Sequence, residues 1–390
     1  MKNTILDYIE LRGDLSPLTH PYNEIDYLIF SELTYIDFHE FLDFSESMTY
    51  TIEDAYHIFL SKHLNIADKT FLRMYTLFSS ISRSPRYRNI KIVYYVNEVD
   101  QDLIKQFSIL ALLLENQTLS IHFKGTDDTF IGWHEDFLML CDESIPSQRC
   151  AVEHLEKLST YPYELSLLQT LKNPYLGQSL YQRFKNYFKY KRQRPILLAG
   201  HSKGGNLAMY AGLFAKQDIQ DRIIHVYNYD GPGFLDEVYE SDEYSRFVDR
   251  MTSFVPHYSL FGILLRHGER RKVVRSIYSH LKQHDGMSWE ISRDGFKEDV
   301  LSIDSQIVAK KIEDMLASLS KDEKRLFIKD LFHTLDKLGF KTINDLSNVS
   351  YKHIVSAVIE FSAIEAKSRK IIMDLIYILF EESQKMKKNN

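Results

Sequence analysis

The sequence has little cysteine and no apolar run long enough to cross a membrane. Its only cysteines are Cys141 and Cys150, whose spacing matches neither a zinc site nor a redox pair, so we expect two reduced, buried thiols. The longest late apolar run, residues 371–380, is interrupted by Asp374 and is too short to span a bilayer. The first residues carry acidic side chains within their apolar stretch and do not match a secretory signal. Together these absences predict a cytoplasmic protein.

A surplus of basic residues is also missing. The formal charge of −6 argues against a general nucleic-acid binder, which needs a positive field to attract phosphates. The chain contains no His-Glu-x-x-His, Walker or dinucleotide-binding glycine pattern, so we expect neither a metal nor a nucleotide cofactor. What it does have is an ordinary globular composition, 44% hydrophobic and 26% charged, over 390 residues. That length suits one large catalytic domain with helical additions.

The apolar pattern divides the chain into three parts. In residues 1–89, apolar residues recur at mostly three- and four-residue spacings, which predicts helices over 23–44, 52–64 and 69–82. In residues 90–295, strand-like runs alternate with helical patterns; these runs lie at 90–96, 119–124, 195–199, 224–229 and 250–255. Alternation of this kind predicts the α/β class, with a mainly parallel sheet and flanking helices.

Residues 296–390 contain helical patterns alone and no recognisable catalytic motif. Within them, Ser320 and Glu323 match a capping box and predict the start of a helix. The last long helix is expected over residues 353–385. We therefore predict a helical C-terminal region beside the α/β core.

The most informative motif is Gly-His-Ser-Lys-Gly at residues 200–204, which follows an apolar strand and precedes a helix of small residues. Gly200 and Gly204 are needed on either side of Ser202, because a Cβ at either position would collide with neighbouring backbone. Such a strained turn lifts a serine Oγ into a cleft. The motif is typical of a nucleophile elbow, so it predicts Ser202 as the nucleophile of an α/β-hydrolase fold.

A nucleophilic serine needs a histidine base, which in α/β-hydrolases follows the serine and the acid along the chain. Four histidines after the elbow helix compete for this role: His257, His267, His280 and His284. We favour His284 because it lies in a turn-rich segment just before a short predicted strand at 289–291, where a loop-borne base is expected. His280 is the second choice. The other interpretation of His284 is a surface histidine beside an acid.

The acid has two interpretations. Asp230 ends the predicted strand at 224–229 and begins an Asp-Gly-Pro-Gly turn, at the sheet edge where catalytic groups gather. An aspartate that only caps its own turn would also be ordinary before Gly-Pro. Asp285 is adjacent to His284 in the sequence and is poorly placed to orient it. We predict Asp230 as the acid, with the capping role as the alternative.

Two backbone N–H groups are expected to bind an oxyanion. One belongs to Lys203, the residue after the nucleophile. The other belongs to Thr126, whose hydroxyl is a further candidate donor, because the strand at 120–124 ends beside it where the early strand-to-helix loop meets the elbow. Asp136, in the helix that follows, is expected to fix this loop rather than to react.

These segments resemble the class 3, fungal-type lipases. The likeness is carried by residues 122–127 with Trp133 and Asp136, and by the elbow at 200–208. Lys203 and Asn206 depart from the family pattern within that elbow. More closely, the chain resembles a bacterial branch of lipase-like α/β-hydrolases of unknown function, through the oxyanion loop with Gly132-Trp133, the elbow, and segments 230–234 and 283–289. The likeness covers roughly residues 20–295 in organisation and leaves the C-terminal helices unexplained.

One departure from the family concerns the acid. The resemblance to class 3 lipases implies an acid after the next strand, in a segment that here spans 251–259 and contains no carboxylate. Either Asp230 supplies the acid from the preceding strand end, or a neutral group such as Ser259 orients the histidine, or the site is weakened. The resemblance therefore supports Ser202, Thr126 and His284 more than it supports Asp230.

Two basic clusters lie outside these motifs. Residues 183–194 hold six basic side chains and no acid. They are expected to form the solvated face of a helix, with contact to phosphate or an anionic lipid as the alternative. The second cluster precedes His284 and would favour an anionic substrate if it bordered the cleft; its members are Arg266, Arg270, Arg271, Lys272 and Arg275.

We therefore predict a serine hydrolase that cleaves a carboxylic ester, acyl or lipid-like, through an acyl-enzyme intermediate. A thioesterase, peptidase or acyltransferase would use the same residues. The alternative from another class is a weak or inactive α/β-hydrolase scaffold that acts as a binding or regulatory module. The expected partner is a small-molecule ester or lipid, with peripheral membrane contact left open, and the oligomeric state is not determined by the sequence.

Overall fold

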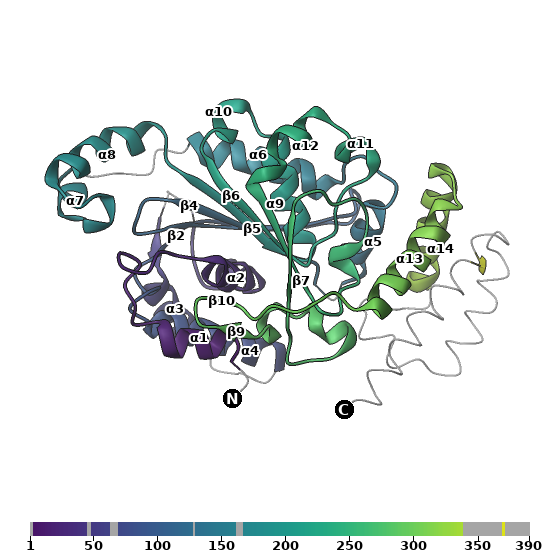
Figure 1. Cartoon of the computed structure of the whole chain (residues 1–390), viewed down its shortest axis with the longest axis horizontal. Helices are drawn as coiled ribbons and strands as arrows, with labels where there is room; N and C mark the ends of the chain where they lie inside the picture. The colour runs from purple at the N-terminus through teal and green to yellow at the C-terminus, as the bar shows by residue number, and fades with distance from the viewer. Residues whose placement is uncertain are drawn as a thin grey trace.

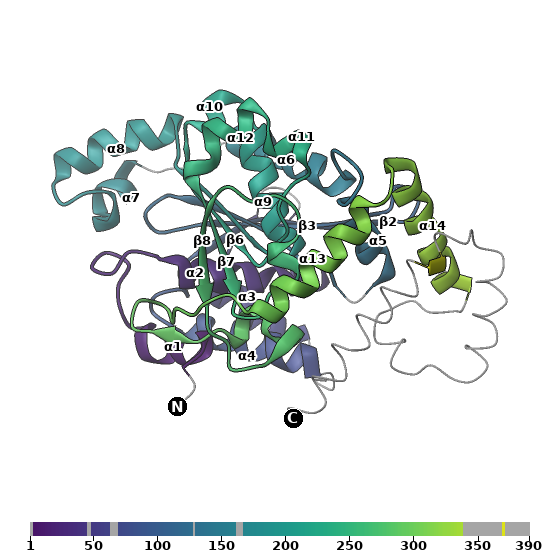
Figure 2. The same ribbon diagram turned by 45° about the vertical axis from the view of Figure 1, so that its right-hand side comes forward.

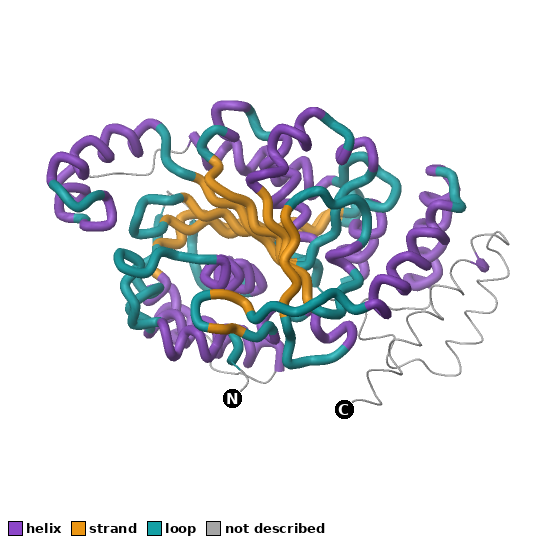
Figure 3. Tube along the Cα trace, in the orientation of Figure 1, coloured by secondary structure: helices purple, strands orange, loops and turns teal. Residues whose placement is uncertain are grey.

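The structure is a computed structural model that describes residues 3–44, 48–62, 69–127, 129–160, 167–337 and 369–370. At its centre is an eight-stranded sheet with helices on both faces (Figures 1 and 3). In spatial order, which is also chain order, the strands are β1 (Tyr50–Thr51), β2 (Lys91–Asp100), β3 (Lys105–Leu113), β4 (Leu119–Phe123), β5 (Ile196–His201), β6 (Ile223–Tyr229), β7 (Met251–Pro256) and β8 (Arg270–Val274). This architecture confirms the predicted fold class.

The two halves of the sheet pair differently. Strands β1 to β4 are antiparallel, and strands β4 to β8 are parallel. Sequence analysis missed β3 because it is buried along most of its length and has a continuous apolar run rather than a period of two. It also missed β8, whose charged side chains are typical of an edge strand.

The parallel half decides where a site can form. The carboxyl ends of β4 to β7 lie at one edge of the sheet, because parallel neighbours run in the same direction. The segments that follow these strands therefore meet at that edge, although they are far apart in the sequence. They include Thr126 after β4, Ser202 after β5 and Asp230 after β6.

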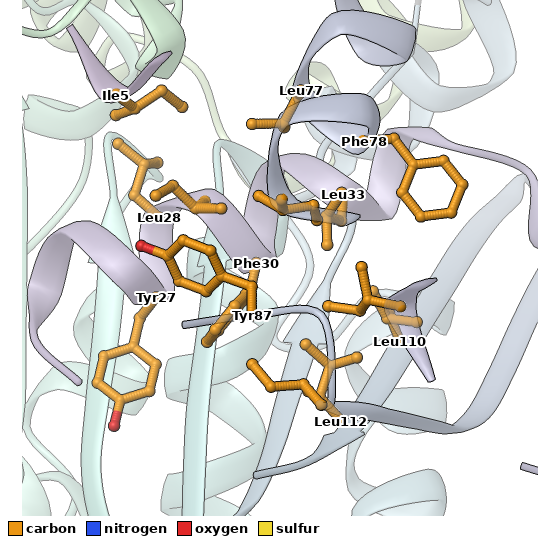
Figure 4. Packing of buried hydrophobic residues seen from close by; sticks show 14 of the residues in the cluster. Ile5, Tyr27, Leu28, Phe30, Leu33, Leu77, Phe78, Tyr87, Leu110 and Leu112 are labelled. Carbon is orange, nitrogen blue, oxygen red and sulfur yellow. The ribbon is translucent and has the colours of Figure 1, made fainter. Parts of the chain in front are cut away.

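The N-terminal helices cover one face of the sheet. They are α1 (Ile5–Arg12), α2 (Glu24–Glu32), α3 (Ile52–Lys62) and α4 (Lys69–Arg83). Figure 4 shows Leu28 and Phe30 of α2 in the same apolar cluster as Leu110 and Leu112 of β3. The N-terminal segment thus shares a core with the sheet.

Helix α2 is shorter than predicted. The helix expected over residues 23–44 ends at Glu32 and is followed by two 3-10 turns, η1 (Leu33–Tyr35) and η2 (Phe38–Glu40). The Asp37 carboxylate accepts a hydrogen bond from the backbone N–H of His39 at 3.0 Å, and local bonds of this kind compete with helical ones. The apolar periodicity continues past the helix because Phe38 is still buried in the same core.

The other face is covered by later helices. They are α6 (Pro146–Thr160), α9 (Lys203–Phe214), α10 (Gln217–Gln220), α11 (Asp236–Tyr239) and α12 (Asp242–Phe247). Helix α5 (Phe130–Leu138) lies towards one side, where α13 (Ile303–Ala317) and α14 (Lys321–Lys337) pack nearby. A hairpin of α7 (Leu167–Lys172) and α8 (Leu180–Arg192) stands out from the opposite side (Figures 1 and 2).

The C-terminal helices begin as the sequence predicts. The backbone N–H of Ser320 donates to Glu323 Oε2 at 2.8 Å, and the N–H of Glu323 donates to Ser320 Oγ at 3.3 Å, so the predicted capping box is present. The helix expected over 353–385 lies outside the described residues, apart from residues 369–370. Between β8 and α13, a small ribbon of β9 (Ile291–Ser292) and β10 (Gly295–Phe296) forms a separate sheet.

A buried ion pair fastens the N-terminal helices together. Arg86, between α4 and β2, donates to both carboxylate oxygens of Asp26 in α2, at 2.8 and 2.6 Å. Its remaining N–H groups donate to the carbonyl oxygens of Leu15, His20 and Pro21. The two charged side chains are 1% and 0% exposed. Removing either partner would therefore leave an uncompensated buried charge.

We expect Asp26→Ala to lower the free energy of unfolding by about 3–5 kcal/mol, measured by urea denaturation followed by circular dichroism. The control is Asp314→Ala, which breaks the exposed Lys310–Asp314 pair of α13 and should leave the denaturation midpoint unchanged. Equal shifts in the two variants would show that burial of the Asp26–Arg86 pair has no special effect.

Candidate active site

Ser202 lies in a strained turn between β5 and α9. Its backbone angles are φ 56° and ψ −131°, a combination that costs energy for a residue with a side chain. Its N–H donates to the carbonyl oxygen of Tyr229 in β6 at 2.8 Å. A Cβ on Gly200 would lie 2.1 Å from the carbonyl oxygen of Gly204, and one on Gly204 would lie 2.0 Å from that of Phe123. Both glycines are required by close backbone contacts, as the motif predicts.

His284 and Asp230 form a direct pair. His284 ends the 3-10 turn η7 (His280–His284), and its Nδ1 lies 2.6 Å from Oδ2 of Asp230, which directly follows β6. The imidazole is 24% exposed, whereas the carboxylate is fully buried. With Nδ1–H donating to the carboxylate, Nε2 is the acceptor of the ring. The geometry thus joins two residues that the sequence analysis selected separately.

Asp230 is held by several further bonds. It adopts φ 55°, and its N–H donates to the carbonyl oxygen of Phe254 in β7 at 2.8 Å. Ser259 Oγ donates to Asp230 Oδ1 at 2.5 Å. Burial raises the pKa of Asp230, while the hydrogen bonds from His284 and Ser259 oppose that shift. Ser259, considered above as a neutral substitute for the acid, instead bonds the second oxygen of Asp230.

The other three histidines have different neighbours. The ring of His280 packs on Tyr258, with centroids 5.3 Å apart. His257 Nδ1 lies 3.4 Å from Asp299. His267 Nδ1 lies 2.7 Å from Glu269. Of the four candidates, His284 is the one that bonds Asp230.

A second histidine supports the segment that carries His284. His201 directly precedes Ser202, and its ring centroid is 4.8 Å from that of His284. Its Nε2–H donates to the backbone carbonyl oxygen of His284 at 2.7 Å, and its Nδ1 accepts from Tyr35 OH at 3.0 Å. Burial lowers the pKa of His201 to about 3, so the ring is neutral and can accept and donate at once. Sequence reasoning missed Tyr35, which lies in η1, and gave His201 no role.

Ser202 is partly exposed, and no hydrogen bond joins it to His284 within the described residues. His201 directly precedes the serine and bonds the backbone of His284, so it links the two segments. In unliganded hydrolases the bond between a catalytic serine and its histidine is often long and tightens only with substrate. Ser202 and His284 are therefore a candidate nucleophile and base.

The loop after β4 lies against the elbow. A Cβ on Gly125 would lie 3.0 Å from Ser202 Cβ and 2.7 Å from the carbonyl oxygen of His201. In the next residue, Thr126 Oγ1 donates to Asp136 Oδ2 at 2.5 Å. Burial raises the pKa of Asp136 to about 6, and the nearby Lys203 charge opposes that shift. Asp136 therefore holds the threonine side chain, as expected for a residue that fixes the loop.

The Lys203 side chain is buried in the core. Its Nζ donates to the carbonyl oxygen of Gln106 at 2.9 Å and lies 3.0 Å from Glu135 Oε2, and the lysine is 1% exposed. Glu135 also accepts two hydrogen bonds from Ser147. This ion pair ties the start of α9 to α5 in the core, and sequence analysis did not predict it. The backbone N–H of Lys203 remains in the first turn of α9, where N–H groups have no intrahelical partner.

Aromatic rings border His284. Phe261, in the 3-10 turn η6 (Phe261–Ile263), lies 4.6 Å from the His284 ring, and Trp133 of α5 lies 5.9 Å from Phe261. Both aromatic side chains are partly exposed. They give one side of the candidate site an apolar surface.

Comparison with known families shows which family the chain belongs to. The family model described as Mbeg1-like matches residues 81–333, a stretch that contains Thr126, Ser202, Asp230 and His284. The chain belongs to the Mbeg1-like family. This is a lipase-like family, so the predicted family relationship is confirmed.

The chain has only distant similarity to solved structures and no match among curated sequences. The chain is similar to M37 lipase at 15% identity, covering 62% of this chain and 70% of that one, with a TM-score of 0.34. It is also similar to the lipase of Rhizomucor miehei in its propeptide complex at 12% identity, covering 55% and 64%, with a TM-score of 0.28. No curated protein matches the chain. No helix within the described ranges is long and apolar enough to cross a membrane.

The second basic cluster stabilises the edge of this Mbeg1-like fold. Lys272 in β8 lies 3.2 Å from Glu24 of α2. Arg275 lies 3.3 Å from Asp299, and Arg266 lies 3.3 Å from Asp236. These three side chains are paired with carboxylates of the fold, whereas Arg270 and Arg271 are exposed on the edge strand β8.

Glu32 is a buried carboxyl group behind the site. Its Oε1 lies 3.7 Å from His201 Nδ1 and has no hydrogen-bond partner among the described residues. Burial raises the pKa of Glu32 to about 7, and the Arg73 charge opposes the shift. Between the ordinary glutamate value of 4.5 and about 7, the folded protein binds a proton that the unfolded chain has released. Stability associated with Glu32 is therefore lost as the pH rises through this window.

We expect Glu32→Gln to raise the free energy of unfolding by up to about 3 kcal/mol at about pH 8, with little effect at about pH 5. Urea denaturation of both proteins at the two pH values measures this difference. Glu143→Gln, at a glutamate whose side chain is 69% exposed, should show no such pH dependence. A Glu32→Gln effect that is the same at both pH values would contradict the assignment.

Proposed function

We propose that this protein is a serine hydrolase that cleaves a carboxylic ester of an acyl or lipid-like substrate through an acyl-enzyme intermediate. The observation that carries the proposal is the 2.6 Å bond between His284 and Asp230 beside the strained turn of Ser202. A buried carboxylate on Nδ1 sets the histidine tautomer that a general base needs. Membership of a lipase-like family supports the same class of reaction.

In this proposal Ser202 Oγ attacks the ester carbonyl carbon while His284 Nε2 takes the serine proton. The negative oxygen that forms accepts hydrogen bonds from the backbone N–H groups of Lys203 and Thr126. His284 then protonates the departing alcohol oxygen, which leaves the acyl group on Ser202. Water attacks the acyl-enzyme with His284 again as the base, and the acid product and free Ser202 are released.

The apolar surface of Trp133 and Phe261 supports an acyl chain as the part of the substrate that is bound. A carboxylic ester is the proposed substrate; thioesters and amides are the comparison substrates in the assay below. A cytoplasmic location is also part of the proposal. The absence of a disulfide between Cys141 and Cys150 supports it, because disulfides are rare in that compartment.

The decisive experiment is labelling with a fluorophosphonate probe, which reacts with an activated serine. We expect the wild-type protein to be labelled and Ser202→Ala to be unlabelled, with loss of turnover on nitrophenyl esters of graded chain length. A hydrolase of acyl esters should turn over esters faster than matched thioesters or amides. Labelling and turnover that persist in Ser202→Ala would reject Ser202 as the nucleophile. Their absence from the wild-type protein would reject the hydrolase and favour a binding scaffold.

We also expect Asp230→Asn to lower kcat by about 10⁴-fold, because the amide would stabilise the wrong histidine tautomer. Ser259→Ala should retain most of the rate, since Ser259 bonds Oδ1 of Asp230 and leaves the bond from Oδ2 to His284 in place. Steady-state kinetics with matched thermal denaturation separate a catalytic effect from unfolding. A larger rate loss in Ser259→Ala than in Asp230→Asn would make the serine, rather than the carboxylate, the group that orients His284.

A further inference from the structure

In the hairpin formed by α7 and α8, one side of α8 makes hydrogen bonds within the hairpin and the other side is exposed. Arg183 donates to the carbonyl oxygens of Gly177 at 2.6 Å and of Leu171 at 3.0 Å. Asn186 donates to the carbonyl oxygen of Leu176 at 2.7 Å. These bonds define the inner side of α8, and the hairpin as a whole projects from the body of the protein in both views (Figures 1 and 2).

The outer side of α8 is apolar and exposed. Leu180 is 66% exposed, Tyr181 74%, Phe184 45% and Phe188 51%. At 3.6 residues per turn these four positions fall within an arc of about 100°, so they form one stripe. Leu168 of α7 is a further exposed apolar side chain of the hairpin, at 64%. A stripe of large apolar side chains on a projecting helix is a feature of an interaction surface.

The same helix is strongly basic. Lys185, Lys189 and Lys191 are exposed, with Lys191 inside the apolar arc and the other two on one flank of it. No acidic residue occurs between Glu164 and Asp218, although the whole chain has a formal charge of −6. The hairpin is therefore a local cationic region on an anionic protein.

Aromatic and apolar side chains flanked by lysines, on a helix with a distinct polar side, are the composition that binds the interface of a negatively charged bilayer. Protein–protein interfaces, in contrast, are depleted of lysine. We propose that the α7–α8 hairpin docks this protein on the surface of an anionic lipid membrane. The apolar stripe would enter the headgroup layer while the lysines contact lipid phosphates.

The position of α8 indicates where a bound membrane would lie relative to the candidate active site. Helix α8 leads into the amino end of β5, and Ser202 follows its carboxyl end. Six residues of strand separate the two by roughly 20 Å. A membrane bound by α8 would therefore lie at the opposite edge of the sheet from the candidate active site. Docking would hold the protein at the membrane, but lipids of the bound bilayer would not enter the candidate active site directly. The inference therefore does not depend on the proposed function.

The test measures co-sedimentation of the full chain with phosphatidylcholine vesicles that do or do not contain phosphatidylserine. We expect binding that requires phosphatidylserine and weakens at high salt. Because each lysine near an anionic surface contributes about 5-fold to partitioning, Lys185→Glu/Lys189→Glu/Lys191→Glu should weaken binding at least about 100-fold. Phe184→Ser/Phe188→Ser should weaken binding as well, because it removes apolar surface that would be buried in the bilayer interface.

Two matched variants serve as controls. Val99→Ser/Ile224→Ser removes apolar side chains that are similarly exposed, at 56% and 53%, but lie on strands β2 and β6. Lys216→Glu/Lys310→Glu reverses exposed charges elsewhere. Both should bind vesicles like the wild type. All variants should keep the wild-type circular dichroism spectrum and thermal midpoint, so loss of vesicle binding is distinguishable from loss of folding.

Three results would overturn the proposal. The first is a wild-type protein that does not bind phosphatidylserine vesicles. The second is binding that the α8 variants leave unchanged or that the control variants reduce equally. The third is concentration-dependent self-association in solution that Phe184→Ser/Phe188→Ser abolishes, which would make this face an interface between two copies of the chain.

Discussion

The buried carboxylate of Asp230 is the constraint on which the candidate site depends. Burying a carboxylate is costly unless its oxygen atoms are hydrogen-bonded, and here Oδ2 bonds His284 while Oδ1 bonds Ser259. These partners come from the segments after β7 and β8, so satisfying one buried group determines the conformation of both. The backbone of Asp230 is itself held by β7 through the carbonyl oxygen of Phe254. The position of the imidazole therefore follows from the register of the parallel strands.

The N-terminal helices contribute to the same arrangement from the other side. Tyr35 follows α2 and bonds His201, which in turn bonds the backbone of His284. Glu32 lies beside this histidine, its Oε1 has no hydrogen-bond partner among the described residues, and burial raises its pKa to about 7. The N-terminal segment thus shares both a core and a set of polar contacts with the sheet. A change in its packing would be expected to reach His284 through these contacts.

The two edges of the sheet have different chemistry. The carboxyl edge gathers Ser202, Thr126, Asp230 and His284 around partly exposed aromatic rings. The amino end of β5 adjoins a hairpin whose exposed side chains are apolar or basic. If both proposals hold, the protein is held at a membrane by one edge and reacts at the other. Its substrate would then reach the site from the solvent side.

The sequence by itself determined the local features: the glycine-flanked turn at Ser202, the loop at Thr126 that follows a strand, and the capping box at Ser320, because each depends on residues within a few positions of one another. It also directed attention to His284 and Asp230, since catalytic side chains follow strand ends. It predicted that Asp230 orients His284 but left a capping role for Asp230 open, because that bond joins residues separated by two helices and the strands β7 and β8. The roles of Ser259, Tyr35 and the Lys203 side chain were decided only by the tertiary structure, which brings the ends of parallel strands to one edge and leaves buried charges to be matched across segments. The edge strand β8 shows the same limit, since its Lys272 pairs with Glu24 of α2, a contact that no linear pattern marks.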